Sequence, residues 1–252
     1  MPPPEPLPLI AHRGWARRYP ENTLAAVRGA LEAGARWVEV DVQLSADHVP
    51  HLFHDRSLER MTGARGALCR RTAQQLATLR ASEPERFGER FDDEPLARLD
   101  AFVELLLSFP QAEAFVELKR AALEVFGVPA VLDAVLPLLQ PVGARCRLIS
   151  FDLAVLRAAR KRCDLELGPV LEGWVERSSE DVLELEPEVV FCNVERLPRA
   201  GPIAPPCGRL AVYEVDEPAT ARALLARGAT WIETFAVGEL AEALAQAEGG
   251  GA

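Results

Sequence analysis

The stretch "LIAHRGWARRYPENT", residues 9–23, contains the unit from which the rest of the fold can be interpreted. Its apolar start predicts a short buried strand over residues 8–12, and Asn22 is a good N-cap for a helix that follows. Between strand and helix, His12 and Arg13 place polar groups at the end of a buried run, where burial is costly without partners. The stretch therefore predicts a strand, a loop whose polar side chains serve a function, and a helix.

This order of strand and helix recurs along the chain. The expected strands cover residues 8–12, 37–44, 113–118, 147–150, 165–170, 189–194, 210–215 and 231–235. The expected helices cover residues 23–33, 99–108, 130–139, 152–162, 179–185, 218–227 and 239–248. Asp152 is a second good N-cap, and Gly34 and Gly228 stand where the glycine after a helix belongs.

Strands that are apolar on both faces and alternate with helices are typical of a parallel sheet covered by helices. Eight such units in about 250 residues favour an α/β fold of the closed (β/α)8 TIM-barrel type. A doubly wound open sheet is the alternative. That fold commonly carries a glycine-rich phosphate-binding motif after the first strand, and none is found here.

Residues 55–98 interrupt the pattern, because this segment is polar, includes "ERFGERFDDEP" and holds no convincing strand. We expect an insertion after the second unit that is partly helical near residues 72–79. The chain is therefore expected to form one TIM-barrel domain over residues 1–252, with an insertion over about residues 55–98.

The composition argues against some classes of partner. A net charge of −10 does not suit nucleic acid, which requires a basic face, although a local site for a small anion remains open. Five widely spread cysteines without a C-x-x-C pair indicate reduced thiols, and residues 1–8 lack the features of a signal peptide. No apolar run approaches the roughly 18 residues of a membrane span. We therefore expect a cytoplasmic protein without stable membrane insertion, and the sequence does not indicate its oligomeric state.

Charged residues interrupt two of the expected strands. Glu39 and Asp41 lie two apart in "WVEVDVQL", and Glu117 and Lys119 lie two apart in "FVELKR", so each pair projects to one side of its strand. In a barrel, charges at the carboxyl ends of strands belong to the active-site face. Three carboxylates that meet there would repel one another unless a cation joined them. Oxygen ligands favour a hard divalent cation, Mg²⁺ or Ca²⁺.

Two positive side chains, Arg13 and Lys119, remain to hold an anion beside that cation. Arginine suits bidentate contact with a phosphate, and lysine suits a point contact. A metal together with these two residues indicates a phosphate ester as the substrate.

The four histidines are His12, His48, His51 and His54. The last three stand three residues apart, but alternation along a strand puts His48 and His54 on one face and His51 on the other. We therefore do not expect a zinc site there. His12 and His54 each end an apolar run, so they are candidates for a general acid and a general base.

The segments "AHRG…PENT", "GARWVEVDVQLSAD", "HLFHDRSLERMTG" and "FVELK" resemble, in that order and near the usual spacing, the motifs of the glycerophosphodiester phosphodiesterase family. The resemblance runs from the first strand to residue 119 and continues loosely to the C-terminus. It implies a metal-dependent (β/α)8 barrel with a small insertion after the second unit.

By position, the resemblance implies roles for individual residues. It assigns catalysis to His12 and His54. It also assigns metal binding to Glu39, Asp41 and Glu117, and contact with the phosphate to Arg13 and Lys119. The Pro-Glu-Asn-Thr loop is expected at the rim of the site, with Asn22 either a helix cap or a direct contact.

Three positions depart from the family pattern. His48 stands where a glycine is common, Tyr213 where a tryptophan is usual, and Thr234 is followed by Phe235 in place of an aspartate. The two late departures lie where the alcohol part of the substrate is expected, and we expect Tyr213 to contact substrate.

We expect hydrolysis of a glycerophosphodiester, a small molecule, to an alcohol and sn-glycerol 3-phosphate. One histidine would activate the nucleophile and the other protonate the leaving alcohol. The working hypothesis takes His54 as base and His12 as acid. The sequence leaves open that assignment, the metal, the head group, and whether water or a neighbouring substrate hydroxyl attacks.

Three alternatives remain. A lysophospholipase D-like enzyme would need an apolar groove, for which Trp174, Tyr213, Trp231 and Phe235 are candidates. A non-catalytic binding barrel would have lost an acid or a histidine, and none is missing. An isomerase of a phosphorylated metabolite would carry a phosphate-binding glycine turn after the last two strands, where only Gly238 stands.

Overall fold

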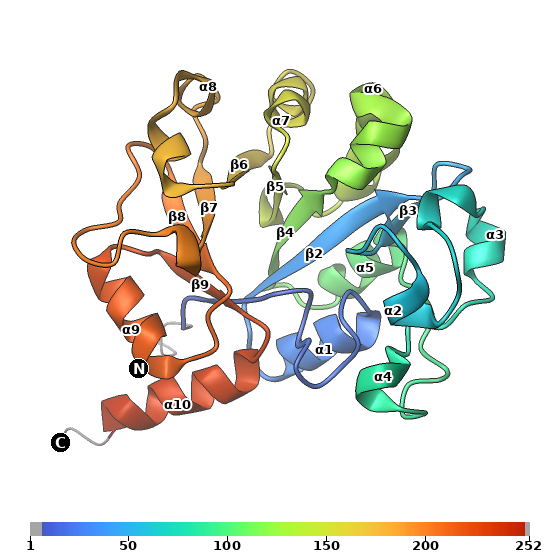
Figure 1. The fold of residues 1–252 in the computed structure, drawn as a ribbon, viewed down its shortest axis with the longest axis horizontal. Coiled ribbons are helices and arrows are strands. Elements are labelled where there is room, and N and C mark those ends of the chain that lie inside the picture. Colours follow the sequence, from blue (N-terminus) through green and yellow to red (C-terminus); the bar gives the residue numbers. More distant parts are fainter. Residues whose placement is uncertain (1–6, 250–252) are drawn as a thin grey trace.

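The structure, a computed structural model that describes residues 7–249, is a closed barrel of parallel strands (Figure 1). The strands are β1 (Leu9–Ala11), β2 (Trp37–Leu44), β3 (Pro50–Leu52), β4 (Glu113–Leu118), β5 (Cys146–Ser150), β6 (Glu166–Leu171), β7 (Val189–Asn193), β8 (Arg209–Tyr213) and β9 (Trp231–Thr234). β1 pairs in parallel with both β9 and β2, which closes the ring. The TIM-barrel prediction is confirmed. The expectations for residues 1–6 and 250–252 lie outside the described part of the chain.

The predicted strands agree with the observed ones to within a few residues at each end, and β2 and β4 agree residue for residue. β3 was not predicted as a strand. It is three residues long and pairs antiparallel with β2, so that Leu44 lies opposite Pro50. The turn between them passes through His48, which has a φ of 63°. This hairpin carries the chain out of the barrel and into the insertion.

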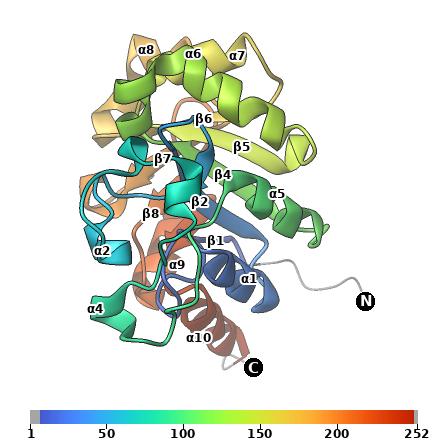
Figure 2. The same ribbon diagram turned by 90° about the vertical axis from the view of Figure 1, so that its right-hand side faces the viewer.

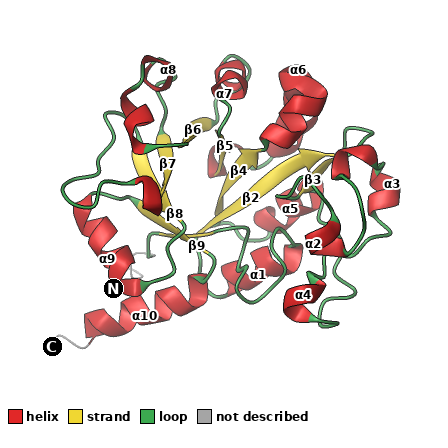
Figure 3. Ribbon diagram, in the orientation of Figure 1, coloured by secondary structure: helices red, strands yellow, loops and turns green. Residues whose placement is uncertain are grey.

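Helices cover the outside of the strands (Figure 3). They are α1 (Leu24–Glu32), α2 (Glu59–Thr62), α3 (Ala73–Leu76), α4 (Pro84–Phe87), α5 (Leu99–Leu107), α6 (Arg120–Leu139), α7 (Leu153–Arg160), α8 (Glu180–Leu183), α9 (Pro218–Arg227) and α10 (Val237–Gly249). α2, α3 and α4 belong to the insertion, and Figure 2 shows α2 and α4 on the side of the strands opposite α5. The five cysteines are free thiols, of which Cys146 and Cys192 are buried.

The expectation that no apolar run approaches the length of a membrane span does not hold for α6 when the helix is judged by its mean hydropathy. α6 is 20 residues long, and its most apolar window has a mean hydropathy of 1.9, enough by length and composition to cross a membrane. Glu124 and Asp133 do not offset the many Val, Leu and Ala residues around them. In the fold, α6 lies against the barrel with a third of that window buried, and Gly127 interrupts its helical backbone. The predicted helix over residues 130–139 is the part after this break.

The barrel interior is arranged in layers. Its middle is filled by an apolar cluster of Ile10, Phe115, Ile149, Val170, Val189, Phe191, Ala211 and Trp231. Below this cluster, near the starts of the strands, Arg147 pairs with Glu113 at 2.7 Å and also with Glu166. Arg209 pairs with the same Glu166 at 2.7 Å. Since ion pairs and apolar side chains fill the lower levels, a site can form only at the carboxyl ends of the strands.

The insertion has a small apolar cluster of its own. Phe53, Leu58, Met61, Leu68 and Leu76 are almost completely buried within it. The segment is therefore a folded excursion that stands beside the mouth of the barrel. It positions Arg60, which is described below.

Gly14 is required by the turn that follows β1. Its φ is 77°, and a Cβ atom there would lie 2.5 Å from the carbonyl carbon of Ala26 and 2.7 Å from the amide nitrogen of Val27. Gly34 also has a positive φ, 92°, but a Cβ there would meet nothing within 4 Å. Only the first glycine therefore combines backbone strain with a steric clash.

We predict that Gly14→Ala lowers the free energy of unfolding by at least about 2 kcal/mol, since overpacking and a left-handed backbone both contribute. Gly34→Ala, the matched control, should cost about 1 kcal/mol from the backbone alone. Urea denaturation of both variants measures the difference. Equal losses would show that the contact of Gly14 with α1 does not constrain the turn.

Candidate active site

The predicted acidic residues meet at the carboxyl ends of β2 and β4. In the parallel register Asp41 lies beside Glu117, and Glu39 lies one inward-facing position below Asp41. One carboxylate oxygen from each of these three residues lies within 4.8 Å of the other two, and all three side chains are buried. The alternation that places Glu39 and Asp41 on one side of β2 therefore also brings them to Glu117.

Two cations share Asp41. Lys119 Nζ lies 3.1 Å from Asp41 Oδ1 and 2.8 Å from Glu117 Oε1, and Arg13 Nε lies 3.1 Å from Asp41 Oδ2. Burial would raise the pKa of Asp41, but Lys119 and Arg13 outweigh it and hold that pKa far below the usual range. The ionised form of Asp41 is thus favoured despite its burial.

The pKa values of the other two acids shift in the opposite direction. Burial, and then the charge of Asp41, raise the pKa values of both Glu39 and Glu117. For Glu117 these effects outweigh the nearby Lys119. Glu39 Oε2 accepts a hydrogen bond from the Arg13 backbone N–H at 3.1 Å, whereas within residues 7–249 its buried Oε1 has no hydrogen-bond partner. The acidic group therefore includes a buried oxygen with unused acceptor capacity.

Asn22 holds Asp41 in place. Its Nδ2 donates to Asp41 Oδ2 at 2.8 Å, and its Oδ1 accepts from the Asp41 backbone N–H at 3.0 Å. Asn22 is not the helix cap, because Thr23 fills that position and accepts from the Ala26 N–H at 3.1 Å. Of the two roles left open for Asn22, the helix cap is thus filled by the next residue, and Asn22 instead contacts Asp41. Its φ of 56° turns the side chain toward β2.

A network from the insertion supports both His54 and Arg13. Arg60 donates to Asp55 at 2.7 and 3.0 Å and to Glu21 at 2.6 Å. Asp55 Oδ1 in turn lies 2.9 Å from His54 Nδ1, and Glu21 Oε1 accepts from Arg13 at 3.0 Å. Despite partial burial, His54 and Arg60 lower the pKa of Asp55. Sequence analysis missed the roles of Glu21, Asp55 and Arg60.

The two histidines have different surroundings. The buried His12 ring stacks on Phe235, with 4.4 Å between ring centroids, and its Nε2 lies 3.8 Å from Glu39 Oε2. Burial, followed by the charge of Arg13, lowers the pKa of His12 well below its usual value. His54 is half-buried, and its Nδ1 carries a proton toward Asp55, because a carboxylate only accepts. The Nε2 of His54 therefore remains for other contacts.

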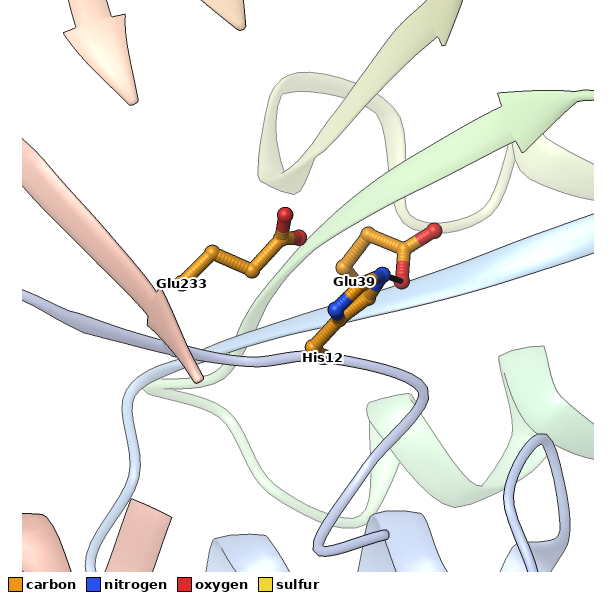
Figure 4. Close-up of side chains that lie close together, drawn as sticks. All are labelled: His12, Glu39 and Glu233. Atoms are coloured by element: carbon orange, nitrogen blue, oxygen red, sulfur yellow. Dashed lines mark ion pairs between the residues drawn. The ribbon is translucent and has the colours of Figure 1, made fainter. Parts of the chain in front are cut away.

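Glu233 was also missed by sequence analysis. Figure 4 shows its side chain extending from β9 toward Glu39 and His12. One donor atom from each of these three residues lies within 4.8 Å of the others. Glu233 is 2% exposed, and among the described residues its Oε1 has no hydrogen-bond partner. The signal was present in "TWIETF", a charge within an apolar strand, which is the same pattern that identified Glu39.

These residues surround a cavity of ≈190 Å³ at the barrel mouth. Its lining includes His12, Arg13, His54, Lys119, Tyr213 and Glu233. The remaining histidines lie elsewhere: the His48 ring contacts Phe126, and His51 Nδ1 lies 2.9 Å from the Val49 carbonyl oxygen.

The structure separates the four aromatic residues suggested for a lipid groove. Trp231 packs in the barrel interior, 5.6 Å from Phe115 between ring centroids. Trp174 packs with the small cluster around α8, and Phe235 stacks on His12. Of the four, only Tyr213, which is half-buried, lines the cavity.

Comparison with curated proteins gives partial alignments. The chain is 42% identical to Glycerophosphodiester phosphodiesterase 1 of Rattus norvegicus over 90 residues, which is 36% of this chain and 27% of that protein. It is 37% identical over 186 residues to Probable glycerophosphodiester phosphodiesterase 1 of Mycobacterium tuberculosis, covering 67% of this chain and 65% of that one. The chain thus aligns with only about a quarter of the length of the rat relative.

Solved structures share the fold over nearly the whole chain. An Oleispira antarctica phosphodiesterase in complex with the product sn-glycerol-3-phosphate superimposes with a TM-score of 0.83 at 22% identity, covering 94% of this chain and 96% of that one. The glycerophosphodiester phosphodiesterase of Agrobacterium tumefaciens gives 0.74 at 25%, with 94% and 99% covered. The family model "Glycerophosphoryl diester phosphodiesterase family" matches residues 12–237. This chain therefore belongs to the glycerophosphoryl diester phosphodiesterase family.

Proposed function

We propose that the protein hydrolyses glycerophosphodiesters to an alcohol and sn-glycerol 3-phosphate. The observation that carries the proposal is the single cavity that His12, His54, Arg13, Lys119 and acidic residues surround, in a chain of this family. The sn-glycerol-3-phosphate bound by the Oleispira antarctica phosphodiesterase supports this choice of product.

The chemistry of the donors fits a divalent cation. Glu39, Asp41 and Glu117 offer carboxylate oxygens within 4.8 Å of one another, and the unpartnered, buried Glu39 Oε1 is suited to a hard metal such as Mg²⁺ or Ca²⁺. We propose that these three residues hold it. When bound, such an ion supplies positive charge that stabilises the transition state of phosphate transfer.

Arg13 and Lys119 would bind the phosphate. Burial opposes their charge, but Asp41 raises both pKa values far above their usual range, with Glu21 adding to the shift of Arg13 and Glu117 to that of Lys119. Both side chains therefore stay positive in a buried site. There they neutralise charge that develops on the phosphate oxygens.

The surroundings of His12 and His54 differ, as is expected of a general acid and a general base. Asp55 fixes the ring of His54 and leaves its Nε2 free to exchange a proton with a reacting oxygen. His12 is buried against Phe235 and stays neutral until it receives a proton. We propose that one of them takes the proton of the nucleophile and the other protonates the departing alcohol.

The direct test supplies purified protein with glycerophosphocholine or glycerophosphoethanolamine and measures released glycerol 3-phosphate. We expect release with Mg²⁺ or Ca²⁺, none with EDTA, and a loss of at least about 100-fold in Glu39→Ala. The metal concentration for half-maximal rate should fall as pH rises, because protons compete with the cation for Glu39 and Glu117, whose pKa values are raised. Release that survives both EDTA and Glu39→Ala would contradict the proposal.

Substitution of either catalytic candidate should reduce turnover. We expect His12→Ala and His54→Ala each to lower kcat by at least about 100-fold. His48→Asn, which tolerates the left-handed turn, is the matched control and should stay within about twofold of wild type. Near-normal kcat in either alanine variant would remove that histidine from the mechanism.

Arg60 should act through its neighbours. We expect Arg60→Leu to lower kcat by about tenfold or more, as for other residues that orient a catalytic group. Because Arg60 and Asp55 act on His54 in series, adding Asp55→Asn should cost less than the sum of the single effects. Arg65→Leu, an exposed site in the same insertion, is the control. Additive losses in kcat would show that Arg60 acts independently of Asp55, and a fall in Tm with unchanged kcat would show a purely structural role.

A further inference from the structure

The two candidate catalytic histidines are held in different ways. Asp55 accepts from His54 Nδ1 and so orients that ring, as a hydrogen bond to one ring nitrogen commonly does. His12 has no such bond. Among residues 7–249 its buried Nδ1 has no hydrogen-bond partner, and its Nε2 lies 3.8 Å from Glu39 Oε2, beyond hydrogen-bond length. The orientation of the His12 ring must therefore come from packing.

Phe235 provides this packing. The rings of His12 and Phe235 are stacked, 4.4 Å apart between centroids and 14° from parallel. The Tyr213 ring lies farther away, at 6.4 Å, and stands at 62° to the imidazole. A stacked contact uses the face of a ring, whereas the two imidazole nitrogens donate or accept within its plane. Stacking therefore holds the His12 ring and leaves both nitrogens available for proton transfer.

The backbone of Phe235 is itself held on both sides. Its N–H donates to Asp216 Oδ1 at 3.2 Å, and its carbonyl oxygen accepts from the Arg17 backbone N–H at 2.9 Å. Asp216 also accepts from the Thr234 hydroxyl and from the Arg17 guanidinium, each at 2.7 Å. Because these bonds join the loop after β1 to the loops after β8 and β9, the fold itself sets the position of the Phe235 ring.

A charged neighbour of the Phe235 ring is held by contacts of its own. Arg13 Cζ lies 5.6 Å from the ring centroid, but Arg13 also forms ion pairs with Asp41 at 3.1 Å and with Glu21 at 3.0 Å. Among the described residues, those that border the cavity include His12 and not Phe235. An effect of Phe235 on the reaction must therefore pass through a neighbour, and His12 is the neighbour that depends on its ring.

We propose that Phe235 is the positioning residue of His12, in the role that Asp55 has for His54. The inference rests on the proposed function and deepens it, because it assigns how the second histidine is oriented for proton transfer. The sequence suggested Phe235 as part of a lipid groove and near the departing alcohol, whereas its ring packs on His12. Small displacements of a reacting group cost large factors in rate, so loss of the ring should lower kcat more than substrate affinity.

The first test compares Phe235→Leu with a matched control on glycerophosphocholine. We expect Phe235→Leu to lower kcat by at least about tenfold and to leave KM within about twofold, because Arg13 and Lys119 still bind the phosphate. Phe235→Tyr keeps an aromatic ring and should retain most of kcat. Phe126→Leu removes the ring that contacts His48 outside the site, and its kcat should stay within about twofold of wild type.

A double-mutant cycle shows whether Phe235 acts through His12. In the His12→Ala background, Phe235→Leu should change the remaining kcat by less than about twofold, because the aromatic ring has no imidazole left to orient. A general loss of stability would instead lower kcat by the same factor in both backgrounds. Equal factors, or wild-type kcat in Phe235→Leu, would overturn the proposal.

Nuclear magnetic resonance tests the contact without turnover. The ring current of Phe235 should shift the ring-proton signals of His12 upfield, and the spectrum of His12→Ala identifies those signals among the four histidines. Phe235→Leu should remove the shift, whereas Phe235→Tyr and Phe126→Leu should keep it. An unchanged His12 signal in Phe235→Leu would overturn the proposal. If the shift depends on Phe235 while glycerophosphodiesters are not hydrolysed, the proposed function fails and the orientation of His12 by Phe235 stands.

Discussion

The site depends on the burial of Asp41 between Arg13 and Lys119. Both cations lie 3.1 Å from its carboxylate, and Asn22 adds hydrogen bonds to its side chain and its backbone. Removing one partner from such a group leaves a buried charge uncompensated, which is strongly destabilising. Asp41 therefore connects the loop after β1 and the end of β4 to β2. These contacts also constrain the backbone of the loop after β1. Arg13 and Asn22 both adopt a left-handed conformation in that loop, with φ of 56°. Such strain persists only where surrounding contacts enforce it.

Because Asp41 engages both cations, neighbouring acidic side chains are left without a cation partner. Once Asp41 has engaged both cations, Glu39 and Glu233 are buried without a cation of their own within contact range in the described structure, apart from the weak approach of His12 to Glu39. Glu39 Oε1 and Glu233 Oε1 are buried without a hydrogen-bond partner among the described residues, and both residues line the same cavity. Glu39 belongs to two groups of closely spaced donor atoms, one with Asp41 and Glu117 and one with His12 and Glu233. The ion pairs and apolar layer beneath keep this arrangement rigid.

Much of the acidic part of the site could be predicted from the periodicity of the sequence. Charges two residues apart on β2 and β4 had to share a face, and parallel strands in register had to bring them together, so Glu39, Asp41, Glu117 and Lys119 were found without coordinates. The contacts of Arg60 could not be found, because they join the insertion to two loops that only the folded chain brings together. Glu233 carried a readable signal, but β9 is four residues long and offers little periodicity. Asn22 and Thr23 are both good caps, and only the turn of the backbone decides between them.

We propose that Glu39, Asp41 and Glu117 hold a divalent cation beside Arg13 and Lys119. The most direct measurement is an anomalous difference map from crystals of the protein soaked in Mn²⁺. We predict a peak within about 2.0–2.6 Å of one oxygen from each of the three carboxylates, the range for hard divalent cations. The absence of such a peak, with Lys119 Nζ still between Asp41 and Glu117 at saturating Mn²⁺, would contradict it.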